Sequence, residues 1–185
     1  MAKQYARISD PLARFIDAQK MFFVATAAPT GRVNLSPKGM DTLRVLDPNR
    51  VAWLSVTGSG NETAAHLLQN SRMTIMFCAF EGHPNILRLY GDAVTHHRGD
   101  ADYDALAPLF PQLPGARNIF VLDVDLVQTS CGMAVPCFDY SGDRDDLNEW
   151  ALRKGADGLE DYWADKNMAS LDGDPTGLPL PTRAV

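Results

Sequence analysis

The stretch VAWLSVTGSGNETAAHL, residues 51–67, decides how this chain can fold. It begins as a continuous apolar run typical of a buried strand, passes through glycine and hydroxyl residues at 57–60, and continues from Asn61 as a helical pattern. Glycines let a backbone approach a ligand closely, and hydroxyls can donate hydrogen bonds to it. The loop matches neither a Walker nor a Rossmann pattern. It is compatible with a phosphate site and equally with a plain turn and helix cap.

Short β-rich segments surround this stretch on both sides. The expected strands are 21–28, 33–36, 42–46, 51–56, 73–80, 86–95 and 118–127. Turns rich in proline, glycine and asparagine separate many of them, and few helices interrupt the series. Short strands at such close spacing favour a mainly β fold with flanking helices, in the form of an antiparallel barrel.

The last quarter of the chain has a different character. Residues 139–174 hold eleven acidic and four basic side chains, whereas the rest of the chain is close to neutral. Helical patterns at 147–154 and 159–168 replace the strands there. We therefore divide the chain into a barrel domain, residues 1–136, and an acidic helical C-terminal extension, residues 137–185, packed on the same domain.

Composition excludes several classes of protein. Apolar residues make up 45% of the chain and charged residues 22%, as in an average globular domain. No apolar run is long enough to cross a bilayer, and the N-terminus lacks a secretory pattern, so we expect a cytoplasmic protein. A net charge of −6 argues against nucleic acid and membrane partners. Cys78, Cys131 and Cys137 do not match a zinc or disulfide pattern, and no metal is expected.

Two further groups of polar residues lie on expected strands. Asn34, Ser36 and Lys38 alternate along the chain, so their side chains should share one face of the sheet. That face could contact a polar ligand or simply water. Arg88 lies between two leucines and needs a partner if it is covered, either a phosphate or a surface carboxylate.

The order of these sequence motifs resembles that of a known protein family. PTGRVNLSPKG (29–39), VAWLSVTGSGNETAAHL (51–67), RMTIMFCAFEG (72–82) and ILRLYGDA (86–93) follow one another as in the pyridoxamine 5′-phosphate oxidase-like flavoproteins. The resemblance covers residues 15–127. It implies a six-stranded antiparallel split β-barrel, packed as a homodimer, with FMN in two clefts at the interface between the subunits.

The resemblance also implies a set of residues around the cofactor. Lys38 matches the strand position whose cation contacts the flavin or its phosphate, and Arg88 lies on a strand that contributes a polar contact from the second subunit. The cofactor-binding residues that we expect are Asn34, Ser36, Lys38, Ser55, Thr57, Gly58, Ser59, Asn61, Thr63 and Arg88. No catalytic residue is assigned.

The chain departs from the vitamin B6 oxidase itself at two points. The loop at 59–63 reads SGNET where that enzyme has a Ser-Arg-Lys run, and its C-terminal Arg/His substrate motif is not found. We therefore expect an FMN-dependent oxidoreductase whose substrate is unknown. Its expected partner is a small-molecule substrate or a nicotinamide donor. The alternatives are a non-catalytic flavin- or haem-binding protein of the same fold and a deazaflavin-dependent reductase.

Overall fold

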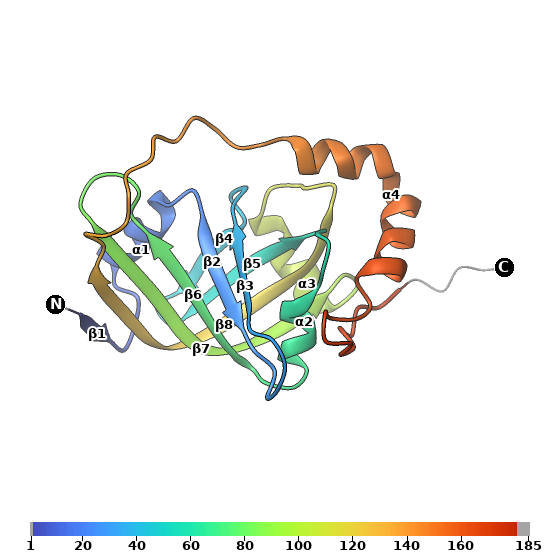
Figure 1. Cartoon of the computed structure of the whole chain (residues 1–185), viewed down its shortest axis with the longest axis horizontal. Coiled ribbons are helices and arrows are strands. Elements are labelled where there is room, and N and C mark those ends of the chain that lie inside the picture. Colours follow the sequence, from blue (N-terminus) through green and yellow to red (C-terminus); the bar gives the residue numbers. More distant parts are fainter. Residues whose placement is uncertain (1, 181–185) are drawn as a thin grey trace.

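The structure is a computed structural model that describes residues 2–180 (Figure 1). Within these residues the chain forms eight antiparallel strands. The strands are β1 (Lys3–Tyr5), β2 (Phe22–Thr26), β3 (Asn34–Lys38), β4 (Leu43–Asp47), β5 (Arg50–Val56), β6 (Arg72–Cys78), β7 (Asn85–His97) and β8 (Ala116–Cys131). They follow the order β3-β2-β6-β7-β8-β5-β4, and β1 pairs with β8. The mainly β split-barrel class expected from the sequence is confirmed, with eight strands in place of six.

The long strands β7 and β8 form the centre of the sheet and carry much of its core. Apolar side chains from β2, β5, β6, β7 and β8 meet in one buried cluster inside the curled sheet. Trp53 stacks on Phe120 there with ring centroids 4.5 Å apart, and Phe22 meets the Trp53 ring edge-on. Because such rings bury a large apolar area, this cluster accounts for much of the stability of the barrel.

At Gly91 the backbone of β7 lies tightly against the backbone of β8. The register between the two strands shifts between Tyr90 and Gly91. A Cβ atom at position 91 would lie 1.9 Å from the carbonyl oxygen of Asp123, so no larger residue fits without moving the backbone. The irregularity bends a strand of thirteen residues, as a bulge does at the corner of a barrel.

Within residues 2–180, four α-helices and one short 3-10 helix flank the sheet. They are α1 (Asp10–Ala18), α2 (Glu62–Leu67), α3 (Ala101–Leu106), η1 (Ala107–Leu109) and α4 (Asp146–Lys166). The helices expected at 147–154 and 159–168 are the two halves of α4, which bends at Gly155, where φ is 68°. No helix within residues 2–180 combines the length and the apolar character needed to cross a bilayer.

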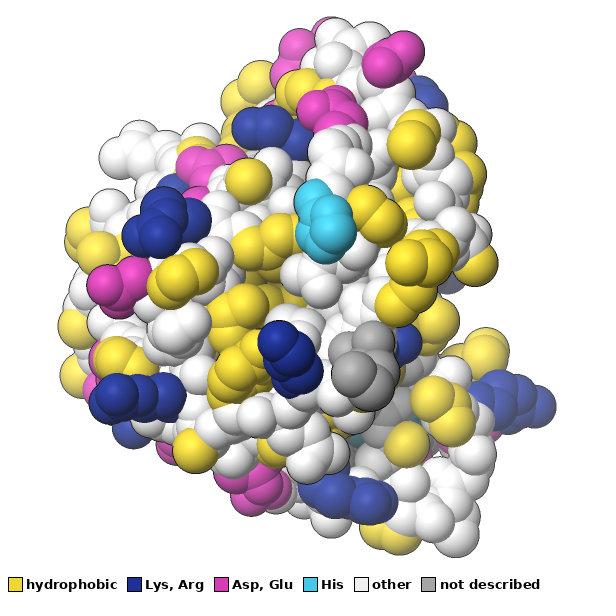
Figure 2. Space-filling model, turned by 90° about the vertical axis from the view of Figure 1, so that its left-hand side faces the viewer, with side chains coloured by type: hydrophobic (Ala, Val, Ile, Leu, Met, Phe, Trp, Pro, Cys, Tyr) yellow, Lys and Arg dark blue, Asp and Glu magenta, His cyan; other side chains and the backbone are white. Residues whose placement is uncertain are grey.

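Residues 132–145, which we call the linker, connect β8 to α4. The linker passes over one end of the barrel as an extended arch, and α4 then descends on the far side (Figure 1). After α4 the chain turns back beside α2. On the face of the molecule seen in Figure 2, apolar side chains gather in a shallow hollow with charged side chains around it.

Candidate functional site

A polar cavity of about 510 Å³ lies between the two ends of the sheet. It is lined by residues of β3, β5, β8, the loop at 58–61 and the segment after α4: Asn34, Ser36, Lys38, Trp53, Ser55, Gly58, Ser59, Gly60, Asn61, Glu62, Thr63, Arg117, Phe120, Lys166, Ala169, Ser170 and Leu171. Strands β3 and β5 are far apart in the sheet order. They face each other only because the sheet curls, so the cavity occupies the split of the barrel.

Arg117 is the most deeply buried cation of this cavity, with 3% of its surface exposed. Its Nη1 donates to the carbonyl oxygen of Gly60 (3.2 Å) and to Oδ1 of Asn167 (2.5 Å). Within residues 2–180 no carboxylate forms an ion pair with its guanidinium. Burial lowers the pKa of Arg117 to about 10, an effect that Tyr162 opposes. The guanidinium therefore remains charged at neutral pH and has no counter-ion among the described residues.

A β-bulge aims Arg117 into the cavity. Ser55 pairs with Asn118 and Val56 pairs with Ala116, so Arg117 is the extra residue of β8 between two regular pairs. Bulges of this kind reorient one side chain relative to its neighbours and are frequent beside functional sites. The guanidinium reaches Ser55, whose Oγ accepts from Nη2 at 3.4 Å.

Lys38 places a second cation on the opposite side of the cavity. Its Nζ lies 5.3 Å from the centroid of the Trp53 ring, which is a favourable cation–π position. Burial, and to a smaller extent the charge of Arg117, lower the pKa of Lys38 to about 8. Two like charges held near each other in a partly dry cavity provide an environment that favours an anion.

Several buried polar atoms on the cavity wall have no partner in the structure. Asn61 is 3% exposed, and both Nδ2 and Oδ1 of its side chain lack a hydrogen bond, as does Nε1 of Trp53. Asn61 precedes α2, yet its side chain makes no capping bond to that helix. An unsatisfied buried polar group costs on the order of 1–3 kcal/mol, so these atoms indicate a ligand that supplies the missing bonds.

Strand β3 contributes a row of polar side chains. Asn34, Ser36 and Lys38 are each half-buried, and the residues between them are exposed, as the alternation predicted. Nδ2 of Asn34 donates to Oγ1 of Thr63 at 3.2 Å, which ties the row to the start of α2. The row thus faces the loop at 58–61 across the cavity.

The residues after α4 close the other side. We call residues 166–171 the C-terminal wall. Asn167 is fully buried, accepts from Arg117, and donates from Nδ2 to the carbonyl oxygen of Gly58 at 3.1 Å. Oγ1 of Thr176 in turn donates to the backbone oxygen of Asn167 at 2.7 Å. Asn167 is thus held on both sides and fixes the guanidinium against the loop.

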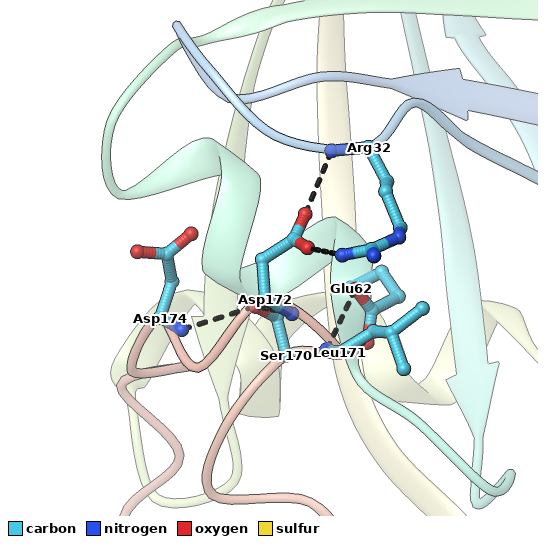
Figure 3. A network of polar contacts seen from close by, with 6 residues as sticks. All are labelled: Arg32, Glu62, Ser170, Leu171, Asp172 and Asp174. Atoms are coloured by element: carbon cyan, nitrogen blue, oxygen red, sulfur yellow. Dashed lines mark hydrogen bonds and ion pairs between the residues drawn. The ribbon is translucent and has the colours of Figure 1, made fainter.

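Figure 3 shows how the C-terminal wall is fastened to the barrel. The backbone N–H of Leu171 donates to both carboxylate oxygens of Glu62, at 3.0 and 3.2 Å. Asp172 accepts from the backbone and the guanidinium of Arg32 (Figure 3). These contacts occupy the one carboxylate of the cavity lining, Glu62, with a donor from the wall.

Eight of the ten site residues expected from the sequence line this cavity; the exceptions are Thr57 and Arg88. Thr57 is completely buried, and its Oγ1 donates to Gly115 and accepts from Nε1 of Trp163. Arg88 donates to Oγ of Ser130 on the neighbouring strand (3.1 Å).

Sequence reasoning missed Arg117 and the C-terminal wall. The strand expected from the sequence begins at residue 118, one residue after Arg117, so the prediction leaves Arg117 outside the sheet. A cation at the start of a strongly apolar strand was the available signal. Asn167 gave no comparable signal, because its role depends on the return of the chain after α4.

Fold and site together define a class: a split barrel with a polar cavity, bordered by Lys38 and Arg117, between the open ends of its sheet. The family described as pyridoxamine 5′-phosphate oxidase matches residues 8–131. A relative from Aspergillus flavus, described as pyridoxamine 5′-phosphate oxidase family protein ustO, is 35% identical over 191 residues, which span 92% of this chain and 76% of the relative. The chain therefore belongs to the pyridoxamine 5′-phosphate oxidase family.

Solved structures agree on the fold. A putative pyridoxamine 5′-phosphate oxidase from Lactobacillus delbrueckii superposes with a TM-score of 0.53 at 19% identity, over 66% of this chain and 94% of that one. HupZ of Group A Streptococcus superposes with the same TM-score at 18% identity, over 66% of this chain and 99% of its own. At such identities the likeness shows the fold alone.

Proposed function

We propose that this chain is an FMN-dependent oxidoreductase whose polar cavity holds the phosphate end of the cofactor. The observation that carries the proposal is the pair Arg117 and Lys38, two cations that face one cavity with no carboxylate paired to Arg117 within residues 2–180. Membership of the family supports a flavin as the ligand.

The residues of the cavity divide into two groups by chemistry. Arg117, Ser59 and Asn61 offer donors to a phosphate near the loop, where a guanidinium can make two parallel bonds. Trp53 and Phe120 form an aromatic wall, and the row on β3 lies where polar ring atoms would need partners. FMN, when bound, supplies two-electron hydride chemistry, while the protein orients the ring and excludes water. Lys38 is positioned to stabilise negative charge on the ring edge.

The chemistry of the cavity favours a flavin over haem. Among the described residues that line the cavity there is no histidine, cysteine or methionine, the usual axial ligands of haem iron. His66, the buried histidine of α2, uses Nδ1 in a hydrogen bond with Thr26 and does not line the cavity. A non-catalytic flavin carrier and a deazaflavin reductase remain as outcomes of the experiment below.

A homodimer with cofactor clefts at the interface is part of the same proposal, as is a cytoplasmic location. On β3 the side chains opposite the polar row are apolar: Leu35 is 64% exposed, and Val33, just before the strand, is 73% exposed. Exposing the apolar outer face of an edge strand to water costs free energy, and a second subunit would cover that face. Arg88, which does not line its own cavity, would then contact the cofactor of the partner.

The direct test is to titrate the purified apoprotein with FMN, riboflavin and haem. Riboflavin lacks the phosphate, and charge-assisted bonds are worth about 1.5–3 kcal/mol each, so we expect riboflavin to bind at least ~100-fold more weakly than FMN. Equal affinities would contradict the phosphate assignment, and tighter haem binding with a Soret band would contradict the flavin.

Turnover is tested on the same sample. Bleaching of the bound FMN by NADH or NADPH, followed by recovery of the colour in air, would support an enzyme. A flavin that no donor bleaches would leave a binding protein.

A further inference from the structure

A second and larger cavity, about 1100 Å³, lies beneath the linker at the end of the barrel. We call it the apolar chamber. Its lining includes the apolar side chains Met21, Pro37, Met40, Phe80, Phe138, Tyr140 and Leu147. The arch of the linker over the barrel end is visible in Figure 1. Charged side chains also occur in the lining, among them Lys20, Lys38 and Glu81. Cavities that bind small organic molecules typically combine apolar and aromatic side chains with polar groups that orient the ligand.

The linker is tied to the barrel without filling the space beneath it. The rings of Phe138 and Phe80 lie 5.4 Å apart, and the backbone N–H of Phe138 donates to the carbonyl oxygen of Phe80 at 3.1 Å. The backbone N–H of Tyr140 donates to Glu81. Even so, Phe138 remains 59% exposed and Tyr140 47% exposed. The chamber therefore has a defined roof whose aromatic surface is left uncovered.

Two charged residues on the barrel side of the chamber, Lys20 and Glu81, contact that roof. Nζ of Lys20 lies 5.6 Å from the ring centroid of Tyr140, and Glu81 accepts from the Tyr140 backbone. Desolvation raises the pKa of the Tyr140 hydroxyl, and its hydrogen bond with Asp143 adds to the increase. Acidic and basic side chains both occur in the lining, so no field of one sign selects a charged ligand.

Lys38 connects the chamber to the polar cavity, because it lines both. Its neighbours along the chain also border the chamber. Met40 is one of two successive non-glycine residues with positive φ, at 62°, and Asp41 follows at 54°. Such a conformation is uncommon and costs free energy, which the surrounding structure must offset. A molecule in the chamber would thus lie directly beyond the cation that borders the cofactor cavity.

From this arrangement we propose that the apolar chamber binds the substrate, and that the substrate is an uncharged small molecule with an aromatic ring rather than a phosphorylated compound. The assignment of the bound molecule as a substrate rests on the proposed function. The chamber itself is a binding site whatever the polar cavity holds. Phe80, Phe138 and Tyr140 would contact the aromatic ring of the substrate, and Lys38 would lie between that ring and the edge of the flavin.

The test uses N-phenyl-1-naphthylamine, an uncharged aromatic probe that becomes fluorescent in apolar sites. We expect saturable binding by the full chain, weakened about fivefold or more by Phe138→Ala, since loss of a ring contact costs on the order of 1 kcal/mol. Met133→Ala is the matched control, because Met133 lies in the same linker, is 82% exposed and does not line the chamber. FMN affinity should be unchanged in both variants.

Each outcome has a separate meaning. Probe binding that Phe138→Ala does not alter, or that 1-naphthyl phosphate displaces as well as 1-naphthol does, would overturn the proposal. A shift of the native mass from dimer to monomer in Phe138→Ala would show that a second copy of the chain fills the chamber, and would also overturn it. Probe binding in a protein that fails to bind FMN would leave the chamber standing and remove the proposed function.

Discussion

The polar cavity has two walls of different origin, and they contribute differently to the site. The barrel wall, from β3, β5 and β8, supplies the groups that face a ligand, above all Lys38 and Arg117. The C-terminal wall, residues 166–171, contacts one of these cations, because Asn167 accepts a hydrogen bond from Arg117 and donates one to the loop. A segment outside the barrel thus helps to fix the orientation of one of its cations, Arg117.

The two walls also differ in charge. The barrel wall holds its cations in partly dry surroundings, and burial lowers the pKa of both. The C-terminal wall meets Arg117 with a neutral amide where a carboxylate would have paired with it. Because an amide orients the guanidinium without neutralising it, the charge remains available to an anion.

The largest effect should come from removing the buried cation of the barrel wall. Arg117→Met removes the buried positive charge and its charge-assisted bonding to a phosphate, and should weaken FMN binding by about 100-fold. Because a buried guanidinium without a carboxylate contributes little to stability, the apoprotein should melt within about 4 °C of the original. Fluorescence titration and calorimetry measure the two quantities. A collapse of stability with FMN affinity retained would make Arg117 a structural residue.

A change in the C-terminal wall should have the next largest effect. Asn167→Asp is nearly isosteric and places a carboxylate against Arg117, which neutralises the cation before a ligand arrives. We expect FMN affinity to fall by about tenfold or more. The melting temperature of the apoprotein should change little, because the new ion pair offsets the lost bond from Asn167 to Gly58. Asn167→Ala is the control, since it removes the contact without adding charge and should lower both quantities. Unchanged FMN affinity in Asn167→Asp would separate the wall from the site.

The pH dependence of binding tests Lys38. Its pKa is lowered to about 8, so the apoprotein loses this charge as the pH rises through 8, and FMN should bind about tenfold more weakly at pH 9 than at pH 7. Lys38→Arg should abolish this dependence. Between pH 8 and 10.5 the unfolded chain still holds the proton that the folded chain has released, so Lys38 makes the stability of the apoprotein rise with pH. If FMN affinity depended on pH equally in the original protein and in Lys38→Arg, Lys38 would be excluded from the site.

The smallest effect is expected for a residue outside the cavity of its own chain. Arg88 is bonded to Ser130 and can reach a cofactor only in the partner subunit of the proposed dimer. Arg88→Ala should weaken FMN binding by less than about tenfold, because one partly solvated contact is worth roughly 1 kcal/mol. Sedimentation should still show a dimer. A monomer that retains FMN fully would rule out the shared cleft.

How much the sequence predicted follows the same division between the walls. The alternation of Asn34, Ser36 and Lys38 and the glycine-rich loop depend on local chain geometry, and eight expected residues do line the cavity. Arg117 was missed because a bulge aims its side chain, and strand periodicity does not predict bulges. Thr57 lies on the predicted loop, but the structure turns it toward Trp163 of α4.

The C-terminal wall could not be predicted at all. Its contacts with the barrel join residues separated by 50 to 109 positions, such as Arg117 with Asn167 and Glu62 with Leu171. They depend on the bend at Gly155 and on the return of the chain beside α2, which no local pattern in the sequence specifies. The family match likewise ends at residue 131, before this segment begins.

A crystal structure of the protein soaked with FMN tests the central claim most directly. The account predicts phosphate density within hydrogen-bond distance of the Arg117 guanidinium and of the Asn61 side chain, with Asn167 still bonded to Arg117. Density for a flavin whose phosphate lies away from Arg117, or a cavity that stays filled only by solvent at saturating FMN, would contradict it.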